Sequence, residues 1–221
     1  MSHTTKKAAA ALKSQQQKPS TADEVTAGAS SPGSLPPVYF WREIDPNLGW
    51  LSQWYECDFT DDKGVVYRSA EHYMMYHKAL VFDDPETGAE ILAADHPRQV
   101  KALGRKVRGF DDDKWKQNRE RIVQDGTRFK FTRAVSEEGL RLGMTEDAPL
   151  VGMSLRGLLL STGTRELVEA SPLDKIWGVG FSPSKAGANR ARWGLNLLGK
   201  ILMQVREEFR KEDGGEEEEK E

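Results

Sequence analysis

The segment around residues 69–82 places a carboxylate and an ammonium on one side of a predicted helix. Glu71 and Lys78 are seven residues apart, so their side chains lie within about 20° of each other around the helix axis. Met74 and Met75 fall between them on the same face. Charges on an apolar face lose hydration at a large free-energy cost unless they are paired or used. Two interpretations follow: a structural ion pair, or an active site that shifts the two pKa values.

Two further clusters combine residue types that can do chemistry. Asp174 precedes Trp177 by three residues, and a Gly178-Val-Gly run follows. This pattern indicates a loop that brings a carboxylate and an aromatic ring to a ligand, or else an aspartate in a turn and a tryptophan in the core. Arg105 follows a glycine at a predicted helix end, where a guanidinium can bind a phosphate or be merely solvated.

The elements that must position these residues follow from hydrophobic periodicity and capping signals. Val38–Trp41 is a predicted strand, and Asp61–Gly64 is the turn of a predicted hairpin. Ser69 is a predicted N-cap for a helix over Ala70–Phe82. The remaining prediction comprises four helices, at Pro85–Ala94, Pro97–Leu103, Trp115–Val135 and Gly187–Phe209, and two short segments, Leu155–Leu160 and Glu166–Glu169, of which the second is a strand. Together they predict a single compact, mainly helical α+β domain with a few short strands.

The aromatic residues delimit this domain. All six tryptophans, eight phenylalanines and five tyrosines lie between Tyr39 and Phe209. Residues 1–36 are rich in Ala, Gln, Ser, Thr and Pro, which predicts a disordered N-terminal tail. Residues 207–221 hold nine acidic and three basic residues, which predicts a solvated, disordered acidic tail over 210–221. We therefore expect one domain over residues 37–209.

Composition excludes several classes of protein. The formal net charge is −3, and residues 37–206 sum to +1, which argues against a protein that coats nucleic acid or an anionic membrane. No apolar run approaches the 18–20 residues, roughly, that span a bilayer. The single cysteine, Cys57, allows no intrachain disulfide and no cysteine-rich zinc site. Without a convincing targeting segment, we expect an intracellular protein, cytoplasmic or nuclear, that needs no metal and no cofactor.

Several ordered motifs carry a resemblance to a known family. They are Gly49-Trp-Leu-Ser-Gln-Trp54, Ser69-Ala-Glu-His-Tyr-Met-Met-Tyr-His-Lys-Ala79, Lys101-Ala-Leu-Gly-Arg105 followed by Trp115, Lys130-Phe131, Leu167-Val-Glu-Ala-Ser171, Asp174 with Trp177-Gly178, and Asn196-Leu-Leu-Gly-Lys-Ile-Leu-Met-Gln-Val-Arg206. In this order, over about Val38–Phe209, they resemble the YbiA-like, or NADAR (NAD- and ADP-ribose-associated), family.

The resemblance implies an enzyme that hydrolyses the N-glycosidic bond between a ribose and a base. Members of the family act on ribosylamino-pyrimidine phosphates, which are riboflavin intermediates, or remove ADP-ribose from guanine in nucleic acid. Carried over by motif, the resemblance implies that Glu71 and Asp174 are catalytic. It implies that six residues bind substrate: Trp50, Lys78, Arg105, Trp115, Trp177 and Gly178. An oxocarbenium-like transition state needs a nearby carboxylate, a second carboxylate can activate water, and aromatic rings stack the base.

The chain departs from the family pattern at three positions, which leaves the substrate open. Gln53 stands where asparagine is common, His77 where glutamine is common, and Val179 where bacterial members have aspartate. The expected partner is a small nucleotide-like molecule, with ADP-ribosylated nucleic acid as the other substrate class, and the sequence does not determine the oligomeric state. A non-catalytic module that binds ADP-ribose or NAD is the alternative function, although such a module needs neither carboxylate. A structural protein that acts through its tails is the third.

Overall fold

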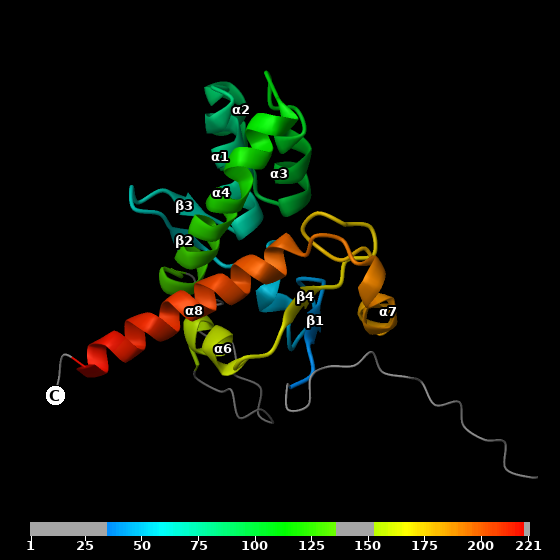
Figure 1. Ribbon diagram of the computed structural model, residues 1–221. Helices are drawn as coiled ribbons and strands as arrows, with labels where there is room; N and C mark the ends of the chain where they lie inside the picture. The colour runs from blue at the N-terminus through cyan, green and yellow to red at the C-terminus, as the bar shows by residue number, and fades with distance from the viewer. Residues whose placement is uncertain (1–34, 136–152, 219–221) are drawn as a thin grey trace, which may run out of the picture.

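The computed structural model describes residues 35–135 and 153–218 (Figure 1). Its elements follow in the order β1 (Val38–Phe40), η1 (Gly49–Leu51), β2 (Phe59–Thr60), β3 (Val66–Tyr67), α1 (Ala70–Val81), α2 (Pro85–Leu92), α3 (Pro97–Gly104), α4 (Asp112–Thr132), α6 (Leu155–Ser161), β4 (Leu167–Glu169), α7 (Pro183–Ala186), η2 (Gly187–Arg192) and α8 (Leu197–Glu218). Helices dominate and the strands are short, which confirms the predicted α+β class.

Helix α1 is central to the first group of elements and packs against α2, α3 and α4. The hydroxyl of Ser69 accepts a hydrogen bond from the backbone N–H of His72 at 3.2 Å, so the predicted N-cap is confirmed. Helix α3 approaches α1 closely because residue 104 is glycine: a Cβ there would lie 2.1 Å from Sδ of Met75. The predicted hairpin is present as β2 and β3, with Gly64 at a φ of 76° in its turn.

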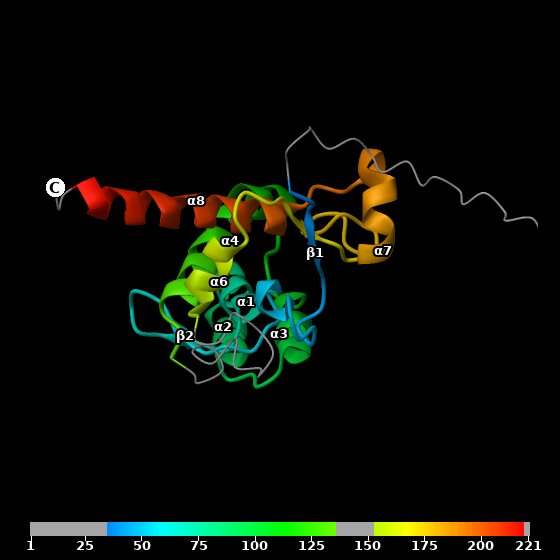
Figure 2. The same cartoon turned by 90° about the horizontal axis from the view of Figure 1, so that it is seen from below.

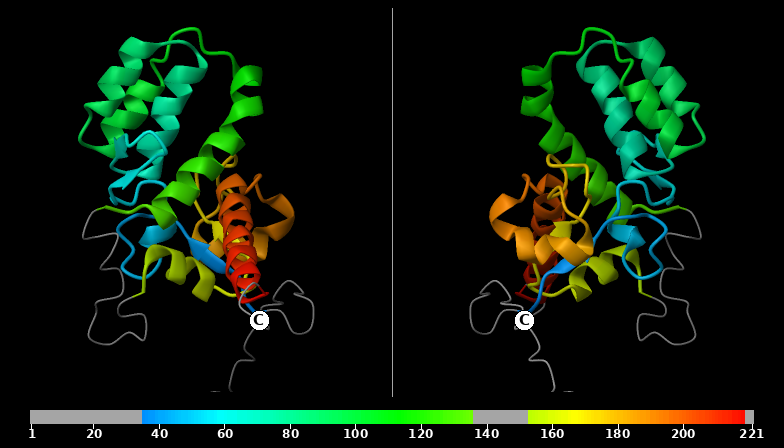
Figure 3. Two further views of the ribbon diagram at one scale, coloured as in Figure 1. Left: turned by 90° about the vertical axis from the view of Figure 1, so that its left-hand side faces the viewer. Right: turned by 90° about the vertical axis from the view of Figure 1, so that its right-hand side faces the viewer.

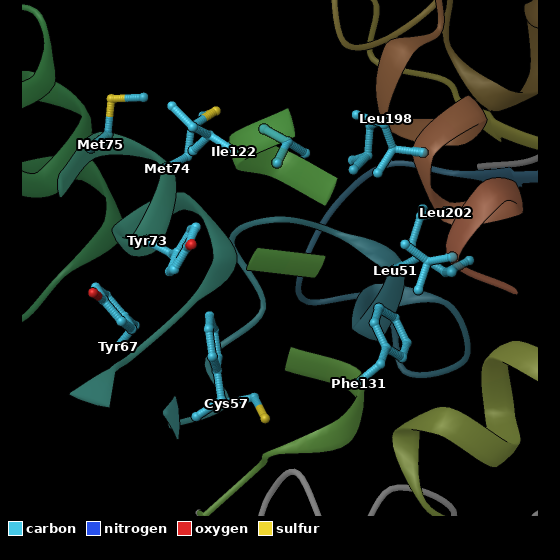
Figure 4. Packing of buried hydrophobic residues seen from close by; sticks show 14 of the residues in the cluster. Leu51, Cys57, Tyr67, Tyr73, Met74, Met75, Ile122, Phe131, Leu198 and Leu202 are labelled. Atoms are coloured by element: carbon cyan, nitrogen blue, oxygen red, sulfur yellow. The ribbon is translucent and has the colours of Figure 1, made fainter. Parts of the chain in front are cut away.

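The second group of elements is built on α8. Helix α8 packs against α4, α6 and β4, and β4 pairs in parallel with β1, with Val38 opposite Leu167 and Phe40 opposite Glu169. Figures 2 and 3 show α4 running between the two groups, with α8 lying across its C-terminal half. A continuous apolar core joins the groups: Met74 of α1, Ile122 of α4 and Leu202 of α8 belong to the same cluster (Figure 4).

The last helix does not begin at Gly187 as predicted. Gly187–Arg192 forms a 3-10 helix, the chain is extended at Trp193, and α8 starts only at Leu197, after Asn196 with a φ of 51°. The physical reason is a competing set of partners. The backbone N–H groups of residues 194–198 donate to carbonyls of residues 175–179, and those bonds replace the helical ones.

The C-terminal boundary also differs from the prediction. A disordered tail is expected from residue 210, yet α8 continues to Glu218. Arg156 of α6 binds Asp213 at 2.7 Å, and Arg128 of α4 binds Glu212 at 2.6 Å, so opposite charges on neighbouring helices keep the acidic segment helical. The predicted N-terminal tail lies almost entirely outside the described residues. No helix within the described ranges is long and apolar enough to cross a membrane.

Candidate active site

A cleft of about 750 Å³ lies where the two groups of elements meet. Both parallel strands end at this cleft, and the loops that follow them line it, as do α1 and α3. Parallel strands present their carboxyl ends at one edge, so loops distant in sequence converge there. The charged lining residues are Arg42, Glu43, Glu71, Lys78, Arg98, Lys101, Arg105, Glu169 and Asp174.

Glu71 lies in the first turn of α1 and is 4% exposed. Its backbone N–H donates to the carbonyl of Gln53 at 2.9 Å, and the Trp54 side chain hydrogen-bonds its carboxyl group. Burial, the largest influence, raises the pKa of Glu71 to about 7, while Lys101 opposes the rise and Asp174 adds to it. Glu71 can therefore exchange a proton near neutral pH.

Lys78 lines the same cleft, but it is not the ion-pair partner of Glu71. Its Nζ donates to the carbonyl of Gly104 at 2.7 Å and lies 4.3 Å from the ring centre of Phe110. Burial lowers the pKa of Lys78, and the charge of Glu71 partly offsets this effect. The structural ion pair considered from sequence does not form, because the ammonium is held against α3 by a backbone carbonyl.

Glu169 is a further carboxyl group of the cleft, as is Glu43, and the sequence did not single it out. Glu169 is the last residue of β4, and its Oε2 is fully covered, with no hydrogen-bond partner among the described residues. Burial raises its pKa to about 8, and the neighbouring Asp174 and Glu71 raise it further in that order, while Lys101 lowers it. The sequence held a signal for Glu169, because this acidic residue stands between two apolar residues, Val168 and Ala170. Both of these neighbours are fully buried in the structure.

The loop with Asp174 and Trp177 forms part of the cleft wall. Oδ1 of Asp174 accepts from the backbone N–H groups of Ile176 and Trp177, both at 2.8 Å. The segment at the start of α8 fixes this loop through backbone hydrogen bonds. Leu195 N donates to the Lys175 carbonyl at 2.8 Å, and Leu198 N donates to the Trp177 carbonyl at 3.1 Å. The carboxylate and the indole ring therefore sit on a rigid turn.

Cationic side chains of α3 face the carboxyl groups. Arg98, Lys101 and Arg105 all line the cleft, and Lys101 lies one helical turn before Arg105, on the same face. Nζ of Lys101 lies 5.2 Å from the ring centre of Trp54. The spacing of Lys101 and Arg105 could have identified the second cation from sequence alone.

Three of the predicted substrate-binding residues do not line the cleft. Trp50 is 5% exposed in the core, and its Nε1 donates to Asn47 O at 2.8 Å. Trp115 lies behind the wall, with Lys78 Nζ 5.8 Å from its ring centre. Gly178 is needed for backbone packing, because a Cβ there would lie 2.7 Å from the carbonyl oxygen of Glu169. The structure brings together the other five predicted residues: Glu71, Lys78, Arg105, Asp174 and Trp177.

Gln53 is a further lining residue whose role was not assigned from sequence. It is 7% exposed, and its Nε2 has no hydrogen-bond partner among the described residues. A smaller hollow of about 130 Å³, beside His72 and Asp95, contains none of the predicted site residues. Within residues 35–135 and 153–218, no group of three His, Cys, Asp or Glu side chains is placed to hold a metal ion.

The fold is that of a mainly helical α+β protein. Its cleft brings carboxyl groups together with cations and an indole ring, an arrangement suited to hydrolysing an anionic, aromatic ligand. Residues 39–210 match the NADAR domain. The chain is 37% identical over 164 residues to N-glycosidase R617 of Acanthamoeba polyphaga mimivirus, a match covering 72% of this chain and 86% of that protein.

Two other relatives extend the comparison. The chain is 32% identical over 173 residues to riboflavin biosynthesis protein VVA0006 of Vibrio vulnificus, covering 78% of this chain and 38% of that relative. The NMR structure of the E. coli protein YbiA superposes with a TM-score of 0.58 at 25% identity, covering 80% of this chain and 87% of that one. The chain belongs to the NADAR family, which confirms the resemblance seen in the sequence. It is a hydrolase of the N-glycosidase class.

Proposed function

We propose that the protein hydrolyses the N-glycosidic bond between ribose and base in a compound that carries a phosphate on the ribose. The observation that carries the proposal is the buried carboxyl group of Glu71, which shares one cleft with the cations of α3 and with Trp177. A phosphorylated riboside has an anionic group, a sugar carbon that becomes cationic in the transition state, and an aromatic base. The cleft offers one chemical complement to each.

Each part of such a substrate has a counterpart in the lining. Arg105 and Lys101 bind the phosphate, because charge-assisted hydrogen bonds to phosphate are among the strongest available in proteins. Trp177 stacks against the base, a contact worth about 1–3 kcal/mol in nucleic-acid complexes. Ionised Glu71 faces the anomeric carbon and stabilises the positive charge that develops as the bond breaks.

Asp174 activates the water in this mechanism. Its Oδ1 is fixed by two backbone N–H groups, so the orientation of its carboxylate is set before substrate binds. The carboxylate takes a proton from the water as the oxygen bonds to the anomeric carbon. The products are a free base and a ribose with a hydroxyl group at that carbon.

Two substrate classes share this chemistry and are separated by experiment. One is a ribosylamino-pyrimidine 5′-phosphate, which the name of the Vibrio relative supports. The other is an oligonucleotide with ADP-ribosylated guanine. The protein is incubated with each, and the released base and sugar are identified by mass spectrometry. We expect release of the base with one of them.

The variant Glu71→Gln tests the chemistry itself. It keeps the size of the side chain and loses the charge, so we expect single-turnover rates to fall by about 10²–10⁴ while substrate still binds. Glu90→Gln, at an exposed position of α2, is the matched control and should leave the rate unchanged. Binding of the substrate without release of a base by the unaltered protein would contradict the proposal and favour a non-catalytic ADP-ribose-binding module.

A further inference from the structure

We propose that Glu169 is a catalytic residue that gives a proton to the departing base. The inference rests on the proposed function, since it assigns a further role in the same cleavage. Glu71 and Asp174 account for the sugar cation and for the water, and neither supplies the proton that a neutral base needs on leaving. Two further carboxyl groups line the cleft, Glu43 and Glu169, and of these only Glu169 has a fully covered oxygen without a hydrogen-bond partner among the described residues.

The backbone around Glu169 is fixed on both sides. Its N–H donates to Oδ1 of Asn196 at 3.0 Å, and its carbonyl accepts from Val179 N at 2.9 Å. Asn196 also donates through Nδ2 to the carbonyl of Leu167 at 3.0 Å, so one side chain binds both ends of β4. The absent side chain of Gly178 permits this close packing. Glu169 is therefore presented to the cleft from a rigid strand end.

The carboxyl group of Glu169 is placed for a ligand rather than for the protein. Its Oε2 is covered completely and has no partner within the described chain. Buried polar atoms are almost always hydrogen-bonded, because an unmade bond leaves the desolvation of that atom uncompensated. Gln53, in the same cleft and 7% exposed, likewise has an amide nitrogen without a partner among the described residues. Unsatisfied groups of this kind in one cleft indicate a polar ligand.

The surroundings of Glu71 and Glu169 affect their proton affinities differently. Glu71 is stabilised in its ionised form by the Trp54 hydrogen bond and by Lys101 and Arg105, and its pKa rises only to about 7. For Glu169, Lys101 is the one opposing cation among the described residues, and the pKa rises to about 8. Of the two, Glu169 has fewer neighbouring cations and a covered oxygen without a partner among the described residues, so its neutral form is the more favoured. Glu169 is therefore the proton donor, and Glu71 acts in its ionised form.

The step balances with this assignment. The bond between the anomeric carbon and the base nitrogen breaks, and its electron pair goes to the base. The proton of Glu169 moves to the base, which leaves as a neutral molecule. The oxygen of water bonds to the anomeric carbon, and the proton of that water goes to Asp174. Before the next turnover Asp174 releases this proton to solvent and Glu169 takes one back. No oxidant, metal or further co-reactant is consumed.

The leaving group provides the test. Glu169→Gln is compared with the unaltered protein on a ribosylamino-pyrimidine 5′-phosphate and on 4-nitrophenyl riboside 5-phosphate. The aminopyrimidine needs a proton to leave, whereas 4-nitrophenolate leaves as an anion. We expect the variant to lose about 10²–10⁴-fold in rate on the first substrate and less than tenfold on the second. The decline in rate above about pH 8 should also disappear. Glu166→Gln, which removes a surface pair with Arg190 outside the cleft, is the matched control.

Each outcome decides the question. An equal loss on both substrates, or none on either, overturns the role of Glu169 while the proposed function stands. If the unaltered protein hydrolyses neither compound nor an ADP-ribosylated guanine, the proposed function itself is wrong. If Glu169→Gln does not fold, Glu169→Asp carries the same comparison. Aspartate retains a carboxyl group, but its shorter side chain holds the proton farther from the substrate. A loss of rate on the aminopyrimidine alone supports the role of Glu169, and an equal loss of rate on both substrates contradicts it.

Discussion

Glu71 and Glu169 make folding depend on pH in an unusual direction for carboxyl groups. The pKa of each is higher in the folded protein than the ordinary value of 4.5. Between that value and the raised one, the folded protein binds more protons than the unfolded chain, so the free energy of unfolding falls as pH rises. Surface carboxylates in ion pairs act in the opposite direction. The two carboxyl groups of the cleft therefore lower the free energy of unfolding at neutral pH, as is common for groups at reactive sites.

The variant Glu71→Gln should be more stable than the unaltered protein at pH 8 and about equally stable at pH 5. The pKa rise from 4.5 to about 7 corresponds to at most about 3 kcal/mol, fully expressed above pH 7. At 2–4 °C per kcal/mol, roughly, for a domain of this size, the thermal midpoint at pH 8 should rise by several degrees. A loss of about 3–5 kcal/mol at both pH values would instead show that Glu71 neutralises a buried cation.

The variant Arg105→Ala should raise KM for a phosphorylated riboside and leave kcat nearly unchanged. Arg105 lines the cleft as a proposed phosphate ligand, and uniform binding of a phosphate affects ground state and transition state alike. The loss of a charge-assisted hydrogen bond corresponds to about tenfold or more in KM. Lys106→Ala, at the exposed position next to it, is the control. Steady-state kinetics that show a collapse of kcat at constant KM would contradict the phosphate role.

At the scale of elements, helix α4 positions the lining through one buried lysine. Lys130 is 2% exposed, and its Nζ donates to the carbonyls of Trp50 and Ser52 at 2.7 and 2.8 Å. Burial lowers its pKa to about 7. These hydrogen bonds connect α4 to the 3-10 turn η1, which leads into Gln53 and Trp54. The ammonium serves as a backbone clamp for one wall of the cleft.

The variant Lys130→Met should lose about 2–4 kcal/mol of stability, because two buried carbonyls lose their donor. The release of η1 should also raise KM, since Ser52, Gln53 and Trp54 line the cleft. Lys116→Met, which removes an exposed pair with Asp112, should change stability by less than about 1 kcal/mol. Chemical denaturation measures both variants. A Lys130→Met protein as stable as the original would mean that water satisfies the carbonyls.

The elements that could be predicted depend on local sequence signals, whereas those that could not depend on contacts with residues distant in the chain. Helix α1 and its cap were predictable because Ser69 and the apolar period of the helix are local signals. The start of α8 was not, because the N–H groups of residues 194–198 are withdrawn from the helix by carbonyls of a loop about twenty residues earlier. The same reasoning applies within the cleft. Glu71 was visible as a charge within a helical apolar face, whereas the position of Trp50 in the core depends on its packing against Phe131.

At the scale of the whole molecule, the C-terminal part of α8 determines where the folded domain ends. Phe209 is completely buried, and Arg156 spans from α6 to its carbonyl at 3.2 Å and to Asp213. Beyond Phe209 the described contacts are a hydrogen bond from Arg210 to the carbonyl of Gly163 and ion pairs between exposed or half-buried side chains, and such pairs contribute little each. The composition of residues 207–221 indicated a solvated segment, and among residues 207–214, whose side chains the structure describes, only Phe209 is buried.

Truncation locates this boundary by experiment. A chain of residues 35–213 should keep the thermal midpoint and the activity of the full chain. A chain of residues 35–210 should lose about 1 kcal/mol, because the pairs Arg128–Glu212 and Arg156–Asp213 are removed. A chain that ends at residue 208 should lose about 3–5 kcal/mol, because the site of Phe209 is left empty in the core. Equal melting curves for the second and third chains would show that Phe209 does not anchor α8, and a large loss already in the first would show that the outer segments pack on the domain.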